Sequence, residues 1–225
     1  MSGPGPLALV GGAEWSKGCQ FDAELLEASG GKEVLVLPTA AAYEHPQRSV
    51  DTATTWFEDM GAGVRPLMVL SRPDAEDPAN AAIVADARFI YLGGGSPLHL
   101  RSVLKDSAVW AALLAAWRNG AVVAGSSAGA MVLTDPMVDP RGGAYTVGLG
   151  LVSQLAVIPH ADTWSTEKAH RTVTLATKGI PVVALDEQTA IIRHLSSERG
   201  WVARGTGNVK VFLNGQESTL DSLPA

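Results

Sequence analysis

Short apolar runs alternate with helix-like segments along residues 1–134, and this alternation constrains the fold more than any other feature of the sequence. Residues 7–10, 34–37 and 89–92 have the length and composition of buried parallel strands. Strands that alternate with helices form βαβ units, which build a parallel sheet with helices on both faces. The sequence therefore predicts an α/β fold in three layers, α/β/α, around a mostly parallel sheet.

Glycines, prolines and apolar periodicity give the remaining boundaries. Further strands are expected at 65–70 and 122–124, and helices at 22–28, 45–60, 80–87, 98–105 and 109–119. Residues 71–80 read as a polar connection and 135–150 as a loop. Beyond the loop we expect a helix at 165–176 and β-type runs at 156–158, 182–185, 190–194, 201–203 and 209–213. This tail predicts a short antiparallel C-terminal extension of a single domain, 1–225.

The composition limits the class of protein. Of 225 residues, 46% are hydrophobic and 18% charged, which is enough apolar material for the core of one domain. The net charge of −6 argues against a nucleic-acid partner, since no Lys/Arg cluster offsets it. We expect a cytoplasmic protein with no membrane partner, because no secretion signal or membrane-length apolar run is found. The single cysteine, Cys19, can form no internal disulfide, and no neighbour in sequence would activate its thiolate.

Residues 125–129 read Gly-Ser-Ser-Ala-Gly and match the pattern G-x-S-x-G between a strand-like run and a helix-like one. Small residues on both sides of such a serine permit a sharp turn that exposes its hydroxyl at the helix N-terminus. The free N–H groups and the helix dipole there stabilise a developing oxyanion. Ser127 is therefore the candidate nucleophile. The alternative is a close-packed turn between helix and sheet that carries no chemistry.

A serine hydroxyl needs a base to take its proton, and the base needs a carboxylate that fixes its tautomer. Among the five histidines, His160 directly follows an apolar run, so we expect it at the same edge of the sheet as Ser127. The alternative for His160 is a hydrogen bond to a loop. The residues leave the carboxylate open among Asp135, Asp139, Asp162, Asp186 and Glu187. The last two are favoured, because they also follow a strand-like run.

Three glycines at 93–95 end the run 89–92, at the same edge of the sheet as residues 125–129. One interpretation of such a glycine turn is that it binds phosphate, but neither G-x-x-x-x-G-K-[ST] nor G-x-G-x-x-G accompanies it. Beside a nucleophilic serine, the amides of Gly94 and Gly95 would form half of an oxyanion hole and the amide of Ala128 the other half. No cluster of residues has metal-ligand spacing, so neither a metal nor another cofactor is expected.

Together these motifs resemble the serine peptidase family that contains aspartyl dipeptidase (peptidase E) and cyanophycinase. The resemblance covers most of the chain. It is carried by VGGAE at 10–14, YLGGGS at 91–96, AGSSAGAMVL at 124–133, a histidine that closes a short strand, LDEQTA at 185–190 and GTGNVKVF at 205–212. It implies a flavodoxin-like fold, related to the class I glutamine amidotransferases.

The resemblance also implies roles for the site residues. Ser127 is the nucleophile, His160 the base and Glu187 the acid of a Ser-His-Glu triad. Asp135 and Asp139, in the loop after the serine motif, are the other candidates for the acid.

Substrate contacts depart from the family pattern. Family members usually carry Asn or Gln soon after the glycines, where this chain has Ser96 and Pro97, and we assign Ser96 to substrate binding. Cyanophycinases tend to have Gln before the histidine and several arginines after it, whereas here Pro159 precedes His160. A substrate carboxylate would pair with Arg171 or Arg101, because arginine binds carboxylates through two parallel hydrogen bonds. Solvated helix-surface arginines are the alternative.

The sequence thus predicts a serine hydrolase that cleaves a small peptide or isopeptide amide bond through an acyl-enzyme on Ser127, without a cofactor. Apolar edges in the tail suit a homodimer. A second interpretation keeps the fold without catalysis, as an amidotransferase-like domain that binds a metabolite or a partner protein. A third is an α/β-hydrolase esterase with His194 as base, although the chain lacks an HGGG-type loop.

Overall fold

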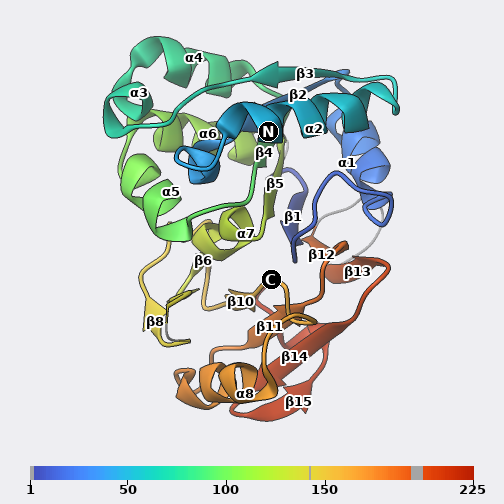
Figure 1. Ribbon diagram of the computed structural model, residues 1–225, viewed down its shortest axis with the longest axis vertical. Coiled ribbons are helices and arrows are strands. Elements are labelled where there is room, and N and C mark those ends of the chain that lie inside the picture. The colour runs from blue at the N-terminus through green and yellow to red at the C-terminus, as the bar shows by residue number, and fades with distance from the viewer. Residues whose placement is uncertain (1–2, 142, 194–199) are drawn as a thin grey trace.

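A mostly parallel sheet of seven strands forms the centre of the protein (Figure 1). The computed structural model describes residues 3–141, 143–193 and 200–225. The strand order is β13 (Trp201–Gly205), β12 (Thr189–Arg193), β1 (Leu7–Val10), β5 (Val122–Ser126), β4 (Phe89–Leu92), β2 (Glu33–Leu37) and β3 (Gly63–Pro66). Neighbours from β1 to β3 pair in parallel, whereas β12 and β13 are antiparallel additions beside β1.

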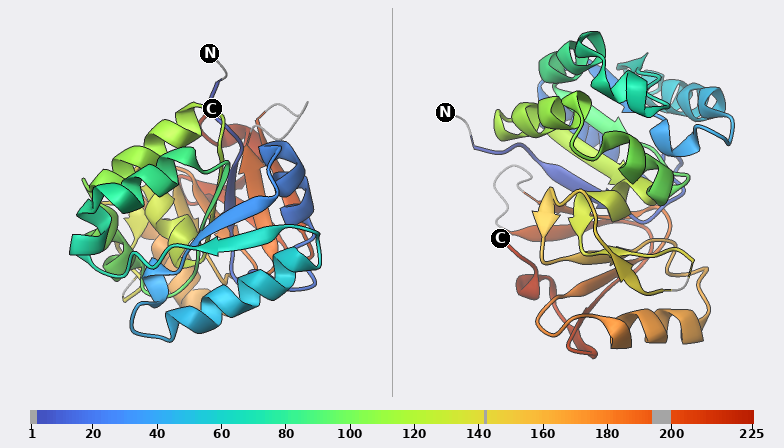
Figure 2. Two further views of the ribbon diagram at one scale, coloured as in Figure 1. Left: turned by 90° about the horizontal axis from the view of Figure 1, so that it is seen from above. Right: turned by 90° about the vertical axis from the view of Figure 1, so that its left-hand side faces the viewer.

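Helices cover both faces of this sheet. Successive residues of a strand point to opposite faces, so the apolar side chains of each buried strand need a covering layer on both sides. One buried cluster joins the sheet to α1 (Phe21–Ser29) and α2 (Pro46–Glu58). The other joins it to α4 (Pro78–Asp86), α5 (Pro97–Leu104), α6 (Ala108–Arg118) and α7 (Ala128–Leu133). Figure 2 shows the strands between these two groups of helices. The predicted three-layer α/β fold is confirmed.

A second, smaller sheet lies below the central one in Figure 1. Its order is β10 (Ala156–Ile158), β11 (Val182–Leu185), β14 (Val209–Leu213) and β15 (Gln216–Ser218), and α8 (Thr166–Leu175) lies beside it. β10 and β11 are parallel, and the other pairs are antiparallel. The tail is therefore divided in a way the sequence did not predict: β12 and β13 extend the central sheet, while the other strands build the second one. Short runs of buried residues identify strands but do not specify their partners.

Three segments between β2 and β10 also differ from the prediction. The loop expected at 135–150 contains the short strands β7 (Met137–Val138) and β8 (Tyr145–Thr146). The strand expected at 65–70 lies at Gly63–Pro66, and the polar connection contains a short helix, α3 (Arg72–Glu76). This helix begins with a capping box between Ser71 and Asp74, which satisfies N–H groups at its first turn. The smaller elements are η1 (Thr39–Ala41), β6 (Thr134–Asp135), β7 (Met137–Val138), β8 (Tyr145–Thr146), β9 (Val152–Ser153) and η2 (Leu220–Ser222).

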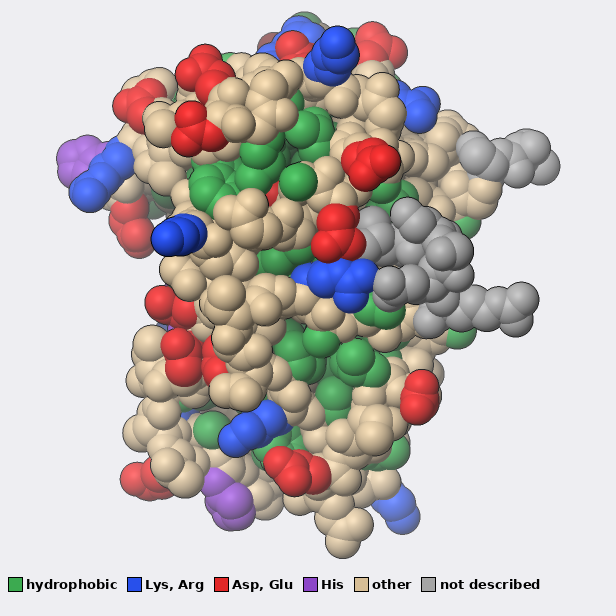
Figure 3. Space-filling model, turned by 90° about the vertical axis from the view of Figure 1, so that its right-hand side faces the viewer, with side chains coloured by type: hydrophobic (Ala, Val, Ile, Leu, Met, Phe, Trp, Pro, Cys, Tyr) green, Lys and Arg blue, Asp and Glu red, His purple; other side chains and the backbone are tan. Residues whose placement is uncertain are grey.

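Charged side chains are mixed in sign on the face shown in Figure 3, where acidic and basic groups are interspersed among neutral ones. The charges on this face do not form the single-sign surface that attracts nucleic acids. Judged by length and apolar content, no helix within the described ranges qualifies as a membrane span.

Candidate active site

Three segments that are distant in sequence donate hydrogen bonds to consecutive carbonyl groups at the end of β1. The Val10 carbonyl accepts a hydrogen bond from the Ser127 amide at 3.0 Å, and the Gly11 carbonyl accepts one from the His160 amide at 2.7 Å. The Gly12 carbonyl accepts one from Gln188 at 2.8 Å, directly after Glu187 in the chain. The turn after β1 therefore positions the backbone at Ser127 and His160 and directly beside Glu187.

Ser127 stands at the turn between β5 and α7, with φ 49° and ψ −107°. This conformation is rare for a residue with a side chain, and it is stable only when the surrounding structure enforces it. Both glycines of the motif are needed for close packing. A Cβ on Gly125 would lie 2.6 Å from the Gly129 carbonyl carbon, and one on Gly129 would lie 2.3 Å from the Leu92 carbonyl oxygen. The sharp turn predicted from G-x-S-x-G is present.

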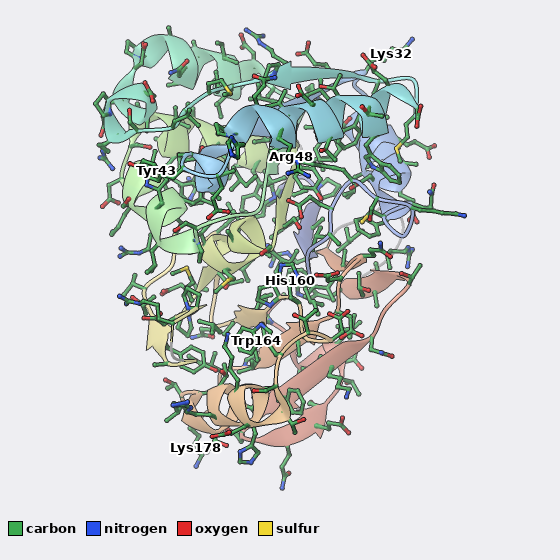
Figure 4. All side chains as sticks on the ribbon, in the orientation of Figure 1. Lys32, Tyr43, Arg48, His160, Trp164 and Lys178 are labelled. Carbon is green, nitrogen blue, oxygen red and sulfur yellow. The ribbon has the colours of Figure 1, made fainter. Side chains whose placement is uncertain are left out.

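Ser127, His160 and Glu187 form one chain of hydrogen bonds. The distance between His160 Nε2 and Ser127 Oγ is 2.9 Å, and that between His160 Nδ1 and Glu187 Oε1 is 2.7 Å. A carboxylate at Nδ1 favours the tautomer with its proton there, which leaves the Nε2 lone pair to accept the serine proton. Figure 4 shows His160 between the central sheet and the second one.

His160 follows a strand of a different sheet from the one we predicted. We expected it at the edge of the central sheet, but it follows β10, which belongs to the second sheet. Its φ of 51° marks a sharp turn after the strand. The hydrogen bond to Gly11 then attaches this turn to the end of β1.

The two loop aspartates are engaged elsewhere. Asp135 Oδ1 accepts a hydrogen bond from the Gly148 amide at 2.9 Å. Asp139 pairs with Arg141 at 2.7 Å, and hydrogen bonds from this arginine lower the pKa of Asp139 to about 2. Within the described residues, Glu187 is the carboxylate that touches His160.

The other two carboxylates support the loop that carries Glu187. Asp162 Oδ1 accepts a hydrogen bond from the Glu187 amide at 3.1 Å. Asp186 Oδ2 accepts two from Asn208, each at 2.8 Å. These contacts hold the backbone around Glu187 in place, while its side chain contacts His160.

The amides predicted for the oxyanion hole are not equivalent. We expected the Gly94 amide to be free to donate to an oxyanion. Instead it donates to Glu14 Oε1 at 2.8 Å. In the described part of the chain, the amides of Gly95 and Ala128 have no hydrogen-bond acceptor. Gly95 has φ 133°, and a Cβ there would lie 2.4 Å from the Ala40 carbonyl oxygen. Gly95 and Ala128 therefore remain as candidate donors.

Glu14 is a site residue that the sequence did not single out. Its Oε1 accepts from Gly94, and its Oε2 accepts from the Ser126 hydroxyl at 2.7 Å. The only signal was its place in VGGAE, just past the carboxyl end of β1. Such a position points to the site edge of a parallel sheet but does not specify a partner.

Three residues were predicted to contact the substrate: Ser96, Arg171 and Arg101. The Ser96 hydroxyl accepts a hydrogen bond from the His99 amide at 3.3 Å and so caps α5. Arg171 lies exposed on α8. Arg101 lies on α5 with a buried Nε that has no partner among the described residues.

A cavity of about 470 Å³ is lined by residues of α8 and of strands β10, β11 and β14 in the second sheet. Asp162, Trp164, His170 and Phe212 are among its lining residues, whereas the triad residues are not. Asp162 therefore connects this cavity to the backbone of Glu187. Within the described ranges, no three His, Cys, Asp or Glu side chains are grouped as metal ligands would be.

Cys19, the other candidate nucleophile, does not compete for this site. Cys19 is buried, and its burial raises the pKa of the thiol to about 11. His99 Nε2 lies 2.9 Å from the Leu70 carbonyl oxygen. His194, the base of the esterase interpretation, lies outside the described residues.

Residues 7–198 match the model of Peptidase family S51. The chain belongs to peptidase family S51. The matched region contains Ser127, His160 and Glu187 as well as the turn after β1. The predicted family is confirmed.

Two curated relatives of this S51 chain are cyanophycinases, from Synechococcus elongatus and Thermosynechococcus vestitus. Each is 26% identical over an alignment of 168 positions, which covers 69% of this chain and 52% of the relative. The S51 chain therefore spans about half the length of the curated relatives it matches.

Solved structures resemble the S51 chain over nearly its whole length. A peptidase from an acI-B1 Actinobacterium has a TM-score of 0.84 and 29% identity, with 96% of this chain and 93% of that chain covered. A putative peptidase E protein from Listeria monocytogenes EGD-e has a TM-score of 0.67 and 20% identity, with 91% and 100% covered. The second likeness shows the fold alone, and it agrees with the predicted fold class.

Proposed function

We propose that this S51 chain is a serine peptidase that cleaves a small peptide or isopeptide amide bond through an acyl-enzyme on Ser127. The observation that carries the proposal is the continuous hydrogen-bonded chain from Ser127 through His160 to Glu187. A hydroxyl, an imidazole and a carboxylate in this order can activate a serine for acyl transfer.

In the first half of the reaction, Ser127 Oγ attacks the amide carbonyl carbon while its proton passes to His160 Nε2. The carbonyl electron pair moves to oxygen, and the amides of Gly95 and Ala128 stabilise this oxyanion. Glu187 stabilises the imidazolium that forms. When the intermediate collapses, the C–N bond breaks and the amine leaves with the proton from His160.

In the second half, a water molecule attacks the ester carbon and gives a proton to His160. The ester bond to Ser127 breaks, and His160 returns the proton to Oγ. All groups regain their starting protonation states, so the cycle consumes one water for each bond cleaved and needs no cofactor.

A small peptide or isopeptide is the substrate class that the relatives support, since they are named as cyanophycinases and peptidases. We assign Ser96 and Arg171 to substrate binding, with Arg101 as the other candidate partner for a substrate carboxylate. Turnover of dipeptides with acidic first residues against neutral ones tests this assignment. The cytoplasmic location and the homodimer stay predictions.

Labelling with a fluorophosphonate probe tests the proposed function without knowledge of the substrate. The parent chain should be phosphonylated on Ser127, and Ser127→Ala should not be labelled. Ser102→Ala, at an exposed serine of α5, is the matched control and should label like the parent. A folded parent that is not labelled would favour the non-catalytic, ligand-binding interpretation instead.

A further inference from the structure

The Glu14 carboxylate joins two loops on either side of the proposed nucleophile. One oxygen accepts the Gly94 amide at 2.8 Å, in the turn after β4, and the other accepts the Ser126 hydroxyl at 2.7 Å, at the end of β5. A Cβ on Gly94 would lie 3.1 Å from Glu14 Oε1 and 3.5 Å from Ser127 Cβ. The carboxylate is thus part of the wall of the site rather than of the outer surface.

The backbone around Glu14 is held in unusual conformations. Ala13 has φ 49° and Trp15 has φ 56°, both in the left-handed region that side-chain-bearing residues rarely adopt. Such conformations persist only where the surrounding structure enforces them, and they cluster at functional sites. Here they flank the residue whose side chain points between the two loops.

Each contact of Glu14 is one residue away from a group that the proposed reaction uses. Gly94 precedes Gly95, whose amide has no acceptor within the described residues. Ser126 precedes Ser127, and the amide of Ala128 follows. Because the two candidate oxyanion donors sit on different loops, the distance between them depends on what holds the loops together.

We propose that Glu14 is a positioning residue that sets the spacing of the Gly95 and Ala128 amides, and so the geometry of the oxyanion hole. This inference rests on the proposed function. Both contacts of Glu14 are charge-assisted hydrogen bonds, which are shorter and stronger than neutral ones. Misplacement of catalytic groups by about 1 Å costs on the order of 10²-fold in rate.

A different role for the same carboxylate would be to bind a substrate ammonium group. The two roles differ in what they require of residue 14. Positioning requires two hydrogen-bonding atoms at the correct distance, which Gln provides and Asp, shorter by one methylene, does not. Ammonium binding requires the negative charge, which Asp keeps and Gln lacks.

The rate of fluorophosphonate labelling tests the positioning role without a substrate, because the probe has no ammonium group for Glu14 to bind. We expect Glu14→Ala and Glu14→Asp to label about 10²-fold more slowly than the parent, by comparison with the loss of one oxyanion donor. Glu14→Gln should stay within roughly tenfold of the parent, because its amide oxygen can accept from Gly94 and its amide nitrogen can donate to Ser126. Ser126→Ala removes one contact and should give a smaller loss than Glu14→Ala. Glu27→Gln, at an exposed carboxylate of α1, is the control.

Two further measurements keep the result interpretable. Thermal unfolding identifies any variant that is simply unfolded at the assay temperature. The plateau of the pH–rate profile should fall in Glu14→Ala. Parent-like labelling of folded Glu14→Ala, or rapid Glu14→Asp with slow Glu14→Gln, overturns the inference. Absence of labelling in the parent overturns the proposed function instead.

Discussion

The imidazole of His160 lies directly against the α-carbon of Gly12 and leaves no space for a side chain there. A Cβ on Gly12 would lie 2.2 Å from His160 Cε1 and 2.6 Å from both ring nitrogens. Gly12 also has φ 130°, a conformation that glycine adopts without strain. The glycine therefore determines where the ring lies between Ser127 and Glu187.

Substitution of Gly12 by Ala should remove activity by displacing His160. We expect Gly12→Ala to lower fluorophosphonate labelling by about 10²-fold or more, because the imidazole must move by the order of 1 Å. Gly30→Ala is the matched control: Gly30 also has a positive φ, 61°, but nothing lies within 4 Å of its added Cβ. Equal labelling of both variants would mean that the ring has room to shift without loss.

Glu187 should contribute through the tautomer of His160. Replacement of a triad carboxylate by its amide lowers turnover by about 10⁴-fold in a comparable triad, so Glu187→Gln should lose on the order of 10³- to 10⁴-fold. Asp135→Asn and Asp139→Asn are the controls, since these carboxylates bond to Gly148 and Arg141 instead. A larger loss in either control than in Glu187→Gln, measured as labelling rate, would transfer the role to that loop aspartate.

Local sequence was sufficient to predict the turn that carries Ser127. Gly125 and Gly129 flank it within five residues, and the packing that requires them involves neighbours that any βαβ unit supplies. The position of His160 was predicted only in part. Its place after a strand was visible, but its approach to Ser127 depends on a second sheet whose strands come from the tail.

Glu14 could not be predicted, because its partners are remote in sequence. Gly94 and Ser126 lie 80 and 112 positions away in the sequence. The periodic patterns of helices and strands relate only residues that are a few positions apart. The sheet partners of β11 and β12 were missed for a related reason. Both strands are buried along their whole length, so no alternation of polar and apolar residues assigned either one to a sheet.

The buried carboxyl group of Asp22 should make the stability of the protein depend on pH. Burial raises the pKa of Asp22 from 3.8 to about 8, although the Trp56 indole donates a hydrogen bond to Oδ2 at 2.9 Å. Between these pH values the folded chain keeps a proton that the unfolded chain releases. The free energy of unfolding therefore falls as pH rises, by at most about 1.4 kcal/mol per pH unit.

Asp22→Asn should remove this dependence while keeping an oxygen that accepts from Trp56. We expect urea unfolding of the variant at pH 5, 6, 7 and 8 to show a shallower decline than the parent. Asp51→Asn, at an exposed carboxylate of α2, should retain the parental slope. Parallel curves for the parent and Asp22→Asn would show that Asp22 is ionised in the folded protein.

Cys19 should be inert in the folded chain, although a thiolate is a stronger nucleophile than a serine hydroxyl. Its side chain is fully buried, its Sγ lies 3.6 Å from the Ala13 carbonyl oxygen, and its pKa is raised to about 11 by burial and by the nearby charge of Asp22. At pH 8 only about one molecule in a thousand would carry a thiolate, and reagents would still have to reach it. We expect iodoacetamide to modify Cys19 only after unfolding, and Cys19→Ala to label with the fluorophosphonate at the parental rate. Rapid alkylation of the folded chain that also abolished labelling would connect the thiol to the site, and the assignment of the nucleophile to Ser127 alone would then have to be abandoned.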